Sequence, residues 1–289
     1  MNAPPTASTR TAVARFGNHP RAGLAFGLAA YGLWGILPIY FEAIRSVPAV
    51  DIVAHRVLWS LPFLAVLVVL GGGREKVRAA VRRPRTLAML TLTALLIGAN
   101  WLLYVYAVTG GHILAASFGY YLNPIANVLL GRFVLREKLT GLQWTAVAIA
   151  AVGIAILAAG ALHQLWLSLA LCVTFALYGL FRKIVPADPL TGLAVETALL
   201  FPLAIAWLGW MALAAQPIFG SSTRDAELLV LAGVISTTPL LLFVGAAKRL
   251  AYSTMGMLQF ISPTLQFLIA VLLYREPVTL AHMIAFPTI

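Results

Sequence analysis

Long apolar runs recur along the whole chain, and short polar segments separate them. Each run holds about 20 residues, which as an α-helix is long enough to cross the ~30 Å hydrocarbon core of a bilayer. The pattern predicts nine membrane-spanning helices, at residues 22–41, 50–70, 86–108, 112–134, 140–160, 164–182, 190–214, 226–247 and 252–274. A tenth helix begins near Thr279 and is truncated at Ile289, because so short a segment extends only about 16 Å.

The composition agrees with an all-α integral membrane protein. Of the 289 residues, 61% are hydrophobic and 10% are charged, and the mean hydropathy is +0.93. Soluble domains average roughly 25% charged residues. The chain is therefore not expected to be a soluble globular protein.

The formal net charge of +11 follows from the positive-inside rule. If the first tail and alternate loops face the cytoplasm, only Arg45, Arg56, Arg224 and Arg275 of the twenty basic residues fall on or near the other side. The cytoplasmic set then includes a basic stretch at 71–85 and the later residues Arg132, Arg136, Lys138, Arg182, Lys183, Lys248 and Arg249. This distribution predicts a cytoplasmic N-terminus and accounts for the charge without a nucleic-acid partner.

The sequence repeats itself with an offset of about 139 residues. The segment Tyr120–Pro124 matches Gln259–Pro263, and an Arg-Glu pair follows each proline at the same distance. Because each half holds five helices, an odd number, the second half must enter the membrane from the opposite face. The sequence thus predicts a cytoplasmic tail (1–21) and two inverted five-helix repeats (22–160 and 161–289), an arrangement typical of transporters that bind substrate between the halves.

Six prolines lie inside the predicted central helices, three in each half. Proline kinks a membrane helix and frees a backbone carbonyl, which is tolerated where neighbours or water satisfy it. They are Pro38, Pro62, Pro124, Pro202, Pro239 and Pro263. Simple packing is one explanation, but the symmetry favours kinks that line a cavity.

Ionisable side chains within membrane helices are costly and are functional candidates by default. His55 and Arg56 lie in the second helix, and Glu196 lies at the equivalent place in the seventh. Arg56 is a candidate for holding an anionic group, unless it extends to the interface while His55 caps a turn. Glu196 is a candidate for proton coupling, unless it only bonds a neighbouring helix.

Aromatic and amide side chains gather in the third and fourth helices and in their second-half counterparts. Such groups suit flat or amphipathic solutes through stacking and a few hydrogen bonds. The candidate cavity residues are Trp34, His55, Arg56, Asn100, Trp101, Tyr104, Tyr120, Tyr121, Asn123, Thr238 and Gln259. Trp101 and Tyr104 could instead anchor a helix end at the interface.

Several chemistries have no support in the sequence. The five histidines are scattered without a zinc-binding spacing, and Cys172 is the only cysteine. No phosphate-binding Gly-Lys-Ser/Thr loop and no aspartate-rich magnesium loop occurs. We therefore expect no enzyme activity, no metal and no cofactor.

Several segments along the chain resemble the RarD family, the chloramphenicol-sensitive or resistance type of permease in the EamA branch of the drug/metabolite transporter superfamily. They are Tyr31-Gly-Leu-Trp-Gly35, His55-Arg56-Val-Leu-Trp-Ser60, Gly98-Ala-Asn-Trp101, Ser117-Phe-Gly-Tyr-Tyr-Leu-Asn-Pro124, Tyr178-Gly-Leu-Phe-Arg-Lys183, Glu196-Thr197, Thr237-Thr-Pro-Leu240 and Gln259-Phe-Ile-Ser-Pro-Thr264. The resemblance implies a bacterial inner-membrane permease that exports or exchanges small organic metabolites or drugs.

Together these features predict a transporter that works by alternating access, with its partners a small-molecule substrate and the lipid bilayer. Two other interpretations stay open. One is a membrane-embedded enzyme acting on lipid-linked substrates, and the other is a truncated remnant that does not transport. The oligomeric state is not indicated by the sequence.

Overall fold

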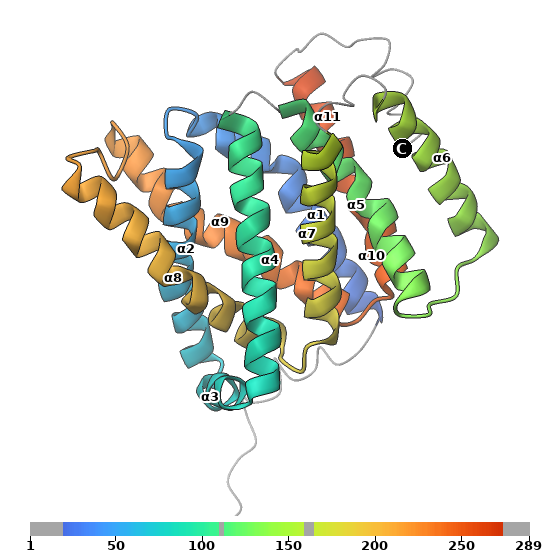
Figure 1. Cartoon of the computed structure of the whole chain (residues 1–289), viewed down its shortest axis with the longest axis horizontal. Helices are drawn as coiled ribbons and strands as arrows, with labels where there is room; N and C mark the ends of the chain where they lie inside the picture. The colour runs from blue at the N-terminus through green and yellow to red at the C-terminus, as the bar shows by residue number, and fades with distance from the viewer. Residues whose placement is uncertain (1–19, 110–112, 159–164, 274–289) are drawn as a thin grey trace, which may run out of the picture.

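The computed structural model describes residues 20–109, 113–158 and 165–273, and within these ranges the regular structure is entirely helical (Figure 1). The helices are α1 (Pro20–Ala43), α2 (Ala49–Leu70), α3 (Arg74–Arg82), α4 (Pro84–Thr109), α5 (Ile113–Phe133), α6 (Gly141–Ala158), α7 (Leu165–Ile184), α8 (Pro189–Leu213), α9 (Thr223–Ala247), α10 (Tyr252–Gln259) and α11 (Ile261–Leu272). The predicted start of a tenth span at Thr279 lies outside the described residues.

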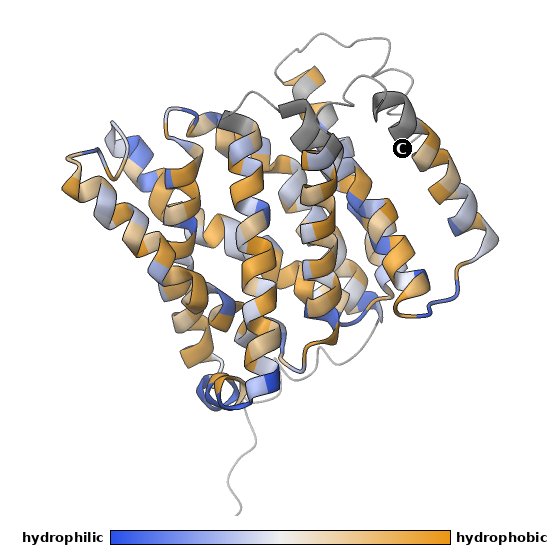
Figure 2. Ribbon diagram, viewed as in Figure 1, coloured by the Kyte–Doolittle hydropathy of each residue, from blue (hydrophilic) through white to orange (hydrophobic). Residues whose placement is uncertain are grey.

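Among the described helices, α1, α2, α4, α7, α8 and α9 are long and apolar enough to cross a membrane. Large apolar side chains point outward from them, including Leu102, which is 60% exposed, and Leu203, which is 65% exposed. Figure 2 shows hydrophobic residues along the flanks of these helices and hydrophilic ones gathered on α3 and on the segment that joins α5 to α6. This is the surface expected of a multi-pass membrane protein.

The helices pack around an aromatic core. The α2 helix lies against α8 and α9, α1 against α9 and α11, α7 against α4 and α5, and α5 against α10. Tyr31, Tyr178, Phe243 and Tyr252 are fully buried between them. The α6 helix packs on α5 and stands at the edge of the bundle (Figure 1).

Two glycines allow the closest helix contacts. A Cβ atom on Gly233 of α9 would lie 2.4 Å from the backbone carbon of Trp59 in α2. One on Gly256 of α10 would lie 2.5 Å from the carbonyl oxygen of Pro124 in α5. Only glycine permits backbones to approach so closely, as is common where membrane helices pack.

The prediction differs from the structure at two places. The basic stretch 71–85 contains a helix, α3, where a loop was predicted. The predicted helix 252–274 is divided at Phe260 into α10 and α11. Pro263 explains the division, since it has no N–H to donate to the carbonyl of Gln259 and its ring clashes with that carbonyl. The other five prolines lie inside helices, as predicted, namely Pro38, Pro62, Pro124, Pro202 and Pro239.

Candidate functional site

A half-buried arginine that lies over a tryptophan ring forms the centre of the first candidate site. The guanidinium carbon of Arg56 on α2 lies 4.6 Å from the centre of a Trp101 ring on α4. Tyr40, Tyr104 and Tyr120, from α1, α4 and α5, lie close enough to interact electrostatically with this guanidinium. A cation over the face of a tryptophan ring is attracted by the ring quadrupole. We call these five residues the Arg56 cluster.

The guanidinium of Arg56 has unused binding capacity. It forms no ion pair with an acid among the described residues, and its buried Nε has no hydrogen-bond partner there. A guanidinium carries five N–H donors in a planar fork that matches a carboxylate or phosphate. Because a partly buried cation without a counter-charge is costly, this cluster is suited to an anionic group.

Asn100 connects Tyr120 of the Arg56 cluster to α7 through hydrogen bonds. Its amide nitrogen donates to the carbonyl of Leu171 at 2.9 Å and to the hydroxyl of Thr174 at 3.0 Å, both on α7. Its amide oxygen accepts a hydrogen bond from the Tyr120 hydroxyl at 3.3 Å. The predicted cavity residue Asn100 is thus buried, and it positions Tyr120.

Trp34 belongs to a series of neighbouring aromatic rings that leads from the Arg56 cluster toward the core. Its ring lies 5.8 Å from that of Phe175 and 5.5 Å from that of Phe243. Phe175 in turn lies 6.4 Å from Tyr120. Trp34 is therefore connected to the Arg56 cluster through Phe175 and Tyr120.

The remaining predicted cavity residues lie in other surroundings. Asn123 is fully buried, and both of its amide atoms lack a partner in the described part of the chain. The side-chain oxygen of Gln259 accepts from the Asn127 amide at 2.7 Å, which joins α10 to α5. Thr238 bonds the carbonyl of Val234 on its own helix. Tyr121 is half-buried next to Tyr120 in sequence.

His55 contacts the segment that connects α8 to α9. Its Nε2 lies 2.8 Å from the carbonyl oxygen of Ile218, and its Nδ1 is 3.3 Å from the indole nitrogen of Trp59. Donation from Nε2 and acceptance at Nδ1 satisfy both ring nitrogens in one neutral tautomer. The fully buried ring also packs 5.0 Å from Phe219. These partners tie α2 to the connection between α8 and α9.

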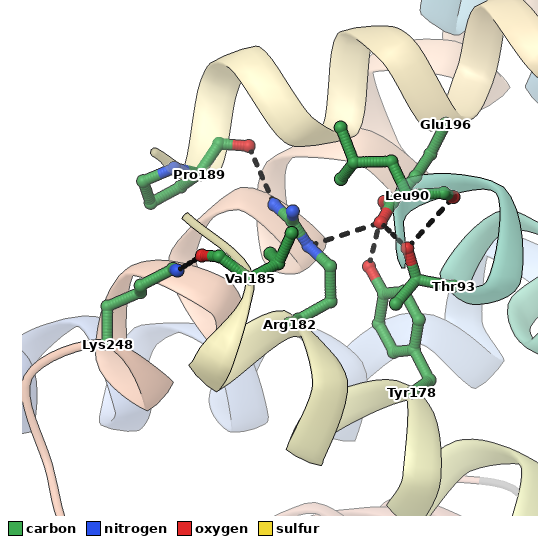
Figure 3. A network of polar contacts seen from close by, with 8 residues as sticks. All are labelled: Leu90, Thr93, Tyr178, Arg182, Val185, Pro189, Glu196 and Lys248. Carbon is green, nitrogen blue, oxygen red and sulfur yellow. Dashed lines mark hydrogen bonds and ion pairs between the residues drawn. The ribbon is translucent and has the colours of Figure 1, made fainter. Parts of the chain in front are cut away.

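Glu196 of α8 is the centre of a second candidate site, a buried polar network (Figure 3). Its Oε1 accepts from the Thr93 hydroxyl at 2.5 Å and lies 3.3 Å from Nε of Arg182. Its Oε2 lies 3.5 Å from the Tyr178 hydroxyl. The Arg182 and Glu196 side chains are 0% and 1% exposed, so the network joins α4, α7 and α8 away from solvent.

Arg182 ends the predicted helix 164–182 and was counted among the basic residues on the cytoplasmic side, but in the structure its side chain is fully buried. Arg182 lies in the last turn of α7, and its side chain points inward to Glu196 and to the carbonyl of Pro189, 3.1 Å from Nη2 (Figure 3). Gly192 leaves room for it, since a Cβ atom there would lie 1.9 Å from Nη1. The signal in the sequence was Gly192, one helical turn before the buried acid.

A third group of contacts closes the end of the molecule where α7 and α9 terminate. The Glu137 carboxylate accepts from the backbone N–H of Tyr252 at 2.6 Å and of Ser253 at 2.9 Å, and from the Ser253 hydroxyl at 2.7 Å. It thereby satisfies the free N–H groups at the start of α10, where a negative charge is also favoured. The repeat analysis singled out Glu137 without assigning this role.

Two lysines bridge the same end. Lys183 of α7 donates to the carbonyls of Ala247, at 2.9 Å, and of Leu250, while Lys248 donates to the carbonyl of Val185. Lys183 therefore satisfies carbonyls at the end of α9, and Lys248 satisfies one at the end of α7. Burial and the neighbouring Arg182 lower the pKa of Lys248 to about 8.

Across the described residues, no three His, Cys, Asp or Glu side chains come together in a way that could hold a metal ion. The functional candidates are thus the Arg56 cluster, the Glu196 network and the contacts around Glu137. The Glu196 network and the contacts around Glu137 join helices from both halves of the chain, whereas the Arg56 cluster draws its five residues from the first half.

Comparison with known proteins identifies the family. Residues 21–159 match the model of the EamA-like transporter family. An uncharacterized transporter of Vibrio cholerae serotype O1 is 44% identical over 92% of this chain and 88% of that protein. Protein RarD of Escherichia coli K12 is 40% identical over 92% of this chain and 90% of that protein. The chain belongs to the RarD family of EamA-like transporters.

Other relatives agree with this assignment. A Pseudomonas aeruginosa relative, described as chloramphenicol-sensitive protein RarD, is 35% identical over 88% of this chain and 86% of that protein. A solved crystal structure of 20% identity covers 93% of this chain and 95% of its own chain with a TM-score of 0.70, which supports the fold alone. This member of the RarD family is therefore a multi-pass membrane protein whose relatives are transporters of bacteria.

Proposed function

We propose that this RarD-family protein is an inner-membrane permease that moves small organic metabolites or drugs by alternating access. The observation that carries the proposal is the Arg56 cluster, where an arginine without an acidic partner among the described residues lies over a tryptophan ring and near three tyrosines. Arg56 binds an anionic group of the substrate, and the rings of Trp101, Tyr104 and Tyr120 stack on its flat parts. The proposed substrate path continues toward the core, where it is completed by Trp34, Tyr121, Asn123, Thr238 and Gln259.

The packing of the helices supports two inverted repeats. The sequence repeat pairs α1 with α7, α2 with α8, α4 with α9, and α5 with α10 and α11. If these partners are exchanged, the contact of α1 with α9 becomes that of α7 with α4, and the contact of α5 with α7 becomes that of α11 with α1. The contacts of α2 with α8 and of α5 with α10 map onto themselves. All of these pairs pack, as a two-fold relation between halves requires.

In the proposed cycle the two halves rock about the proline-containing helices, with the N-terminus in the cytoplasm. The contacts of Glu137, Lys183 and Lys248 then hold the cytoplasmic end closed in this state. Opening that end requires the carboxylate of Glu137 to leave the start of α10 and both lysines to release their carbonyls. Water is the natural replacement partner for each of these groups.

Glu196 is proposed to couple transport to protons. Proton uptake removes the charge that holds Nε of Arg182, which loosens the contact between α7 and α8. The change can reach the substrate path because Tyr178, 3.5 Å from Glu196, stacks on Phe243 with ring centres 6.4 Å apart. Phe243 contacts Trp34. The alternative is that the pair of Arg182 and Glu196 only stabilises the fold.

Flux into proteoliposomes tests the proposal. Labelled aromatic amino acids and labelled chloramphenicol are offered with and without a pH gradient, to the wild-type protein and to a Glu196→Gln variant. Protein-dependent flux that responds to the gradient only when Glu196 is present is the expected result. Equal gradient dependence in the Glu196→Gln variant contradicts the coupling role, and the absence of flux for these solutes and for related aromatic carboxylates contradicts the permease.

A further inference from the structure

The short helix α3 lies across the ends of the membrane-spanning helices. In Figure 1 it is seen end-on at the lower edge of the bundle, whereas α2 and α4 run upward from it. Gly71, Gly72 and Gly73 separate it from α2, and Gly72 has a φ of +64°, which glycine adopts without strain. Because the axis of α3 crosses those of α2 and α4 (Figure 1), it runs along the membrane surface if these two helices span the bilayer.

One side of α3 is anchored to the protein. Ala80 is 5% exposed and belongs to an apolar cluster with Leu90, Val185 and Val195, against which Val77 also packs. The ammonium of Lys76 on α3 lies 3.7 Å from the carboxylate of Asp188, the residue at the start of α8. These contacts fix the rotation of the helix about its axis, and therefore the direction in which its other side faces.

The other side of α3 is a stripe of exposed arginines. Arg74, Arg78 and Arg82 follow one another at intervals of four residues, which places them on one face of the helix. None of the three forms an ion pair with an acid in the described part of the chain. Arg83 and Arg85 continue the positive charge, and Glu75 is the only acid between residues 71 and 85.

Exposed apolar side chains lie close to this stripe in the sequence. Val81, one residue before Arg82, is 45% exposed, and Leu70 at the end of α2 is 80% exposed. A surface helix with arginines beside exposed apolar groups matches the boundary between lipid headgroups and acyl chains. A purely aqueous partner such as a nucleic acid would not favour these apolar neighbours.

We propose that the arginine stripe of α3 binds the phosphate groups of anionic phospholipids in the adjoining leaflet. Each guanidinium offers a planar fork of donors to a phosphate, and the position of α3 at the membrane surface places headgroups within reach. The binding acts on the Glu196 network through the anchored side of α3. On that side Ala80 shares an apolar cluster with Val195, the residue before Glu196, and Lys76 pairs with Asp188, which caps α8. Anionic lipid therefore stabilises the first turns of α8.

Native mass spectrometry of the detergent-purified full chain tests this proposal, with equal amounts of phosphatidylglycerol and phosphatidylcholine supplied. The test variant replaces Arg74, Arg78 and Arg82 with glutamine. The control variant replaces Arg132, Arg136 and Lys138 with glutamine; these residues carry the same total charge and lie exposed in the last turn of α5 and just after it. Since one basic residue near an anionic surface strengthens binding by about fivefold, the test variant is expected to lose tenfold or more of its preference for phosphatidylglycerol. The control is expected to lose less than threefold.

Equal losses in the two variants would mean that net charge alone attracts the lipid and would overturn the proposal, as would an unchanged preference in the test variant. Should the triple variant fail to fold, the three single Arg→Gln variants replace it, and each is expected to lose about fivefold. Inorganic phosphate at the same concentration is expected not to raise the unfolding temperature, whereas phosphatidylglycerol does. Displacement of the lipid by a short DNA strand would assign the stripe to nucleic acid instead.

Discussion

The guanidinium of Arg182 and the carboxylate of Glu196 form an ion pair of 3.3 Å between two helices, and water reaches neither side chain. Buried pairs of this kind gain little net stability, because both charges give up their hydration. Their loss is nevertheless costly when only one partner is removed. The pair therefore specifies how α7 and α8 meet more than it strengthens the fold.

This relationship predicts a non-additive mutant cycle. Glu196→Gln or Arg182→Gln alone is expected to lower the free energy of unfolding by about 3–5 kcal/mol, because each leaves an uncompensated buried group. The double variant is expected to lose less than the sum of the two. Reversible unfolding in mixed micelles measures all four proteins. Additive losses would contradict the direct pairing of the two charges.

The space above Gly192 predicts a second result. Gly192→Ala places a methyl group 1.9 Å from Nη1 of Arg182, so the guanidinium must move and its bond to Glu196 weakens. A loss of about 1–3 kcal/mol is expected. Gly209→Ala is the matched control on the same helix, because a Cβ atom there meets nothing within 4 Å, and it is expected to be neutral or slightly stabilising. Equal effects at the two sites would contradict the account of how Arg182 is accommodated.

The three hydrogen bonds of Glu137 predict a third result, a loss of stability when its carboxylate is removed. Glu137→Ala removes the acceptor for the first N–H groups of α10 and is expected to cost about 1.5–3 kcal/mol, as for hydrogen bonds to a charged group. The exposed neighbour Lys138 provides the control, and Lys138→Ala is expected to change stability by less than about 0.5 kcal/mol. Thermal unfolding in detergent compares the two. A Glu137 variant as stable as the Lys138 variant would exclude the capping role.

The lowered pKa of Lys248 predicts a fourth result, in the pH dependence of stability. Its pKa is about 8 in the folded chain, whereas its ordinary value is 10.5. Between these values the unfolded chain binds more protons at this residue, so its contribution makes the protein more stable as the pH rises from 8 toward 10.5. The difference between wild type and Lys248→Met, measured across this range, isolates that slope. Parallel curves for the two proteins would exclude the shift.

Much of the fold could be predicted because membrane-spanning helices are long and apolar, and their lengths are fixed by the bilayer. The helix α3 was missed for the opposite reason. It is a charged segment of nine residues whose stability comes from packing Val77 and Ala80 on its neighbours, which no local pattern reveals. The division at Phe260 follows from Pro263, which was predicted as a kink.

The candidate site was predictable only in part. Arg56, Glu196 and the aromatic residues were found because polar and ionisable groups are rare in such helices. The pairing of Glu196 with Arg182 depends on how far α7 extends and on which way its last turn faces, and charge distribution alone placed Arg182 with the loop residues. The roles of Arg56 and Glu196 in transport stay predictions.

The most direct test of the central claim is flux through proteoliposomes by an Arg56→Gln variant beside an Arg45→Gln variant. Arg45 is an exposed arginine of the same half, paired with Glu42 on the surface, and its loss should leave transport unchanged. We predict that Arg56→Gln raises the KM for an anionic aromatic substrate at least tenfold and has a much smaller effect on an uncharged one. Equal KM values for the anionic substrate in both variants would contradict the assignment of the Arg56 cluster as the substrate site.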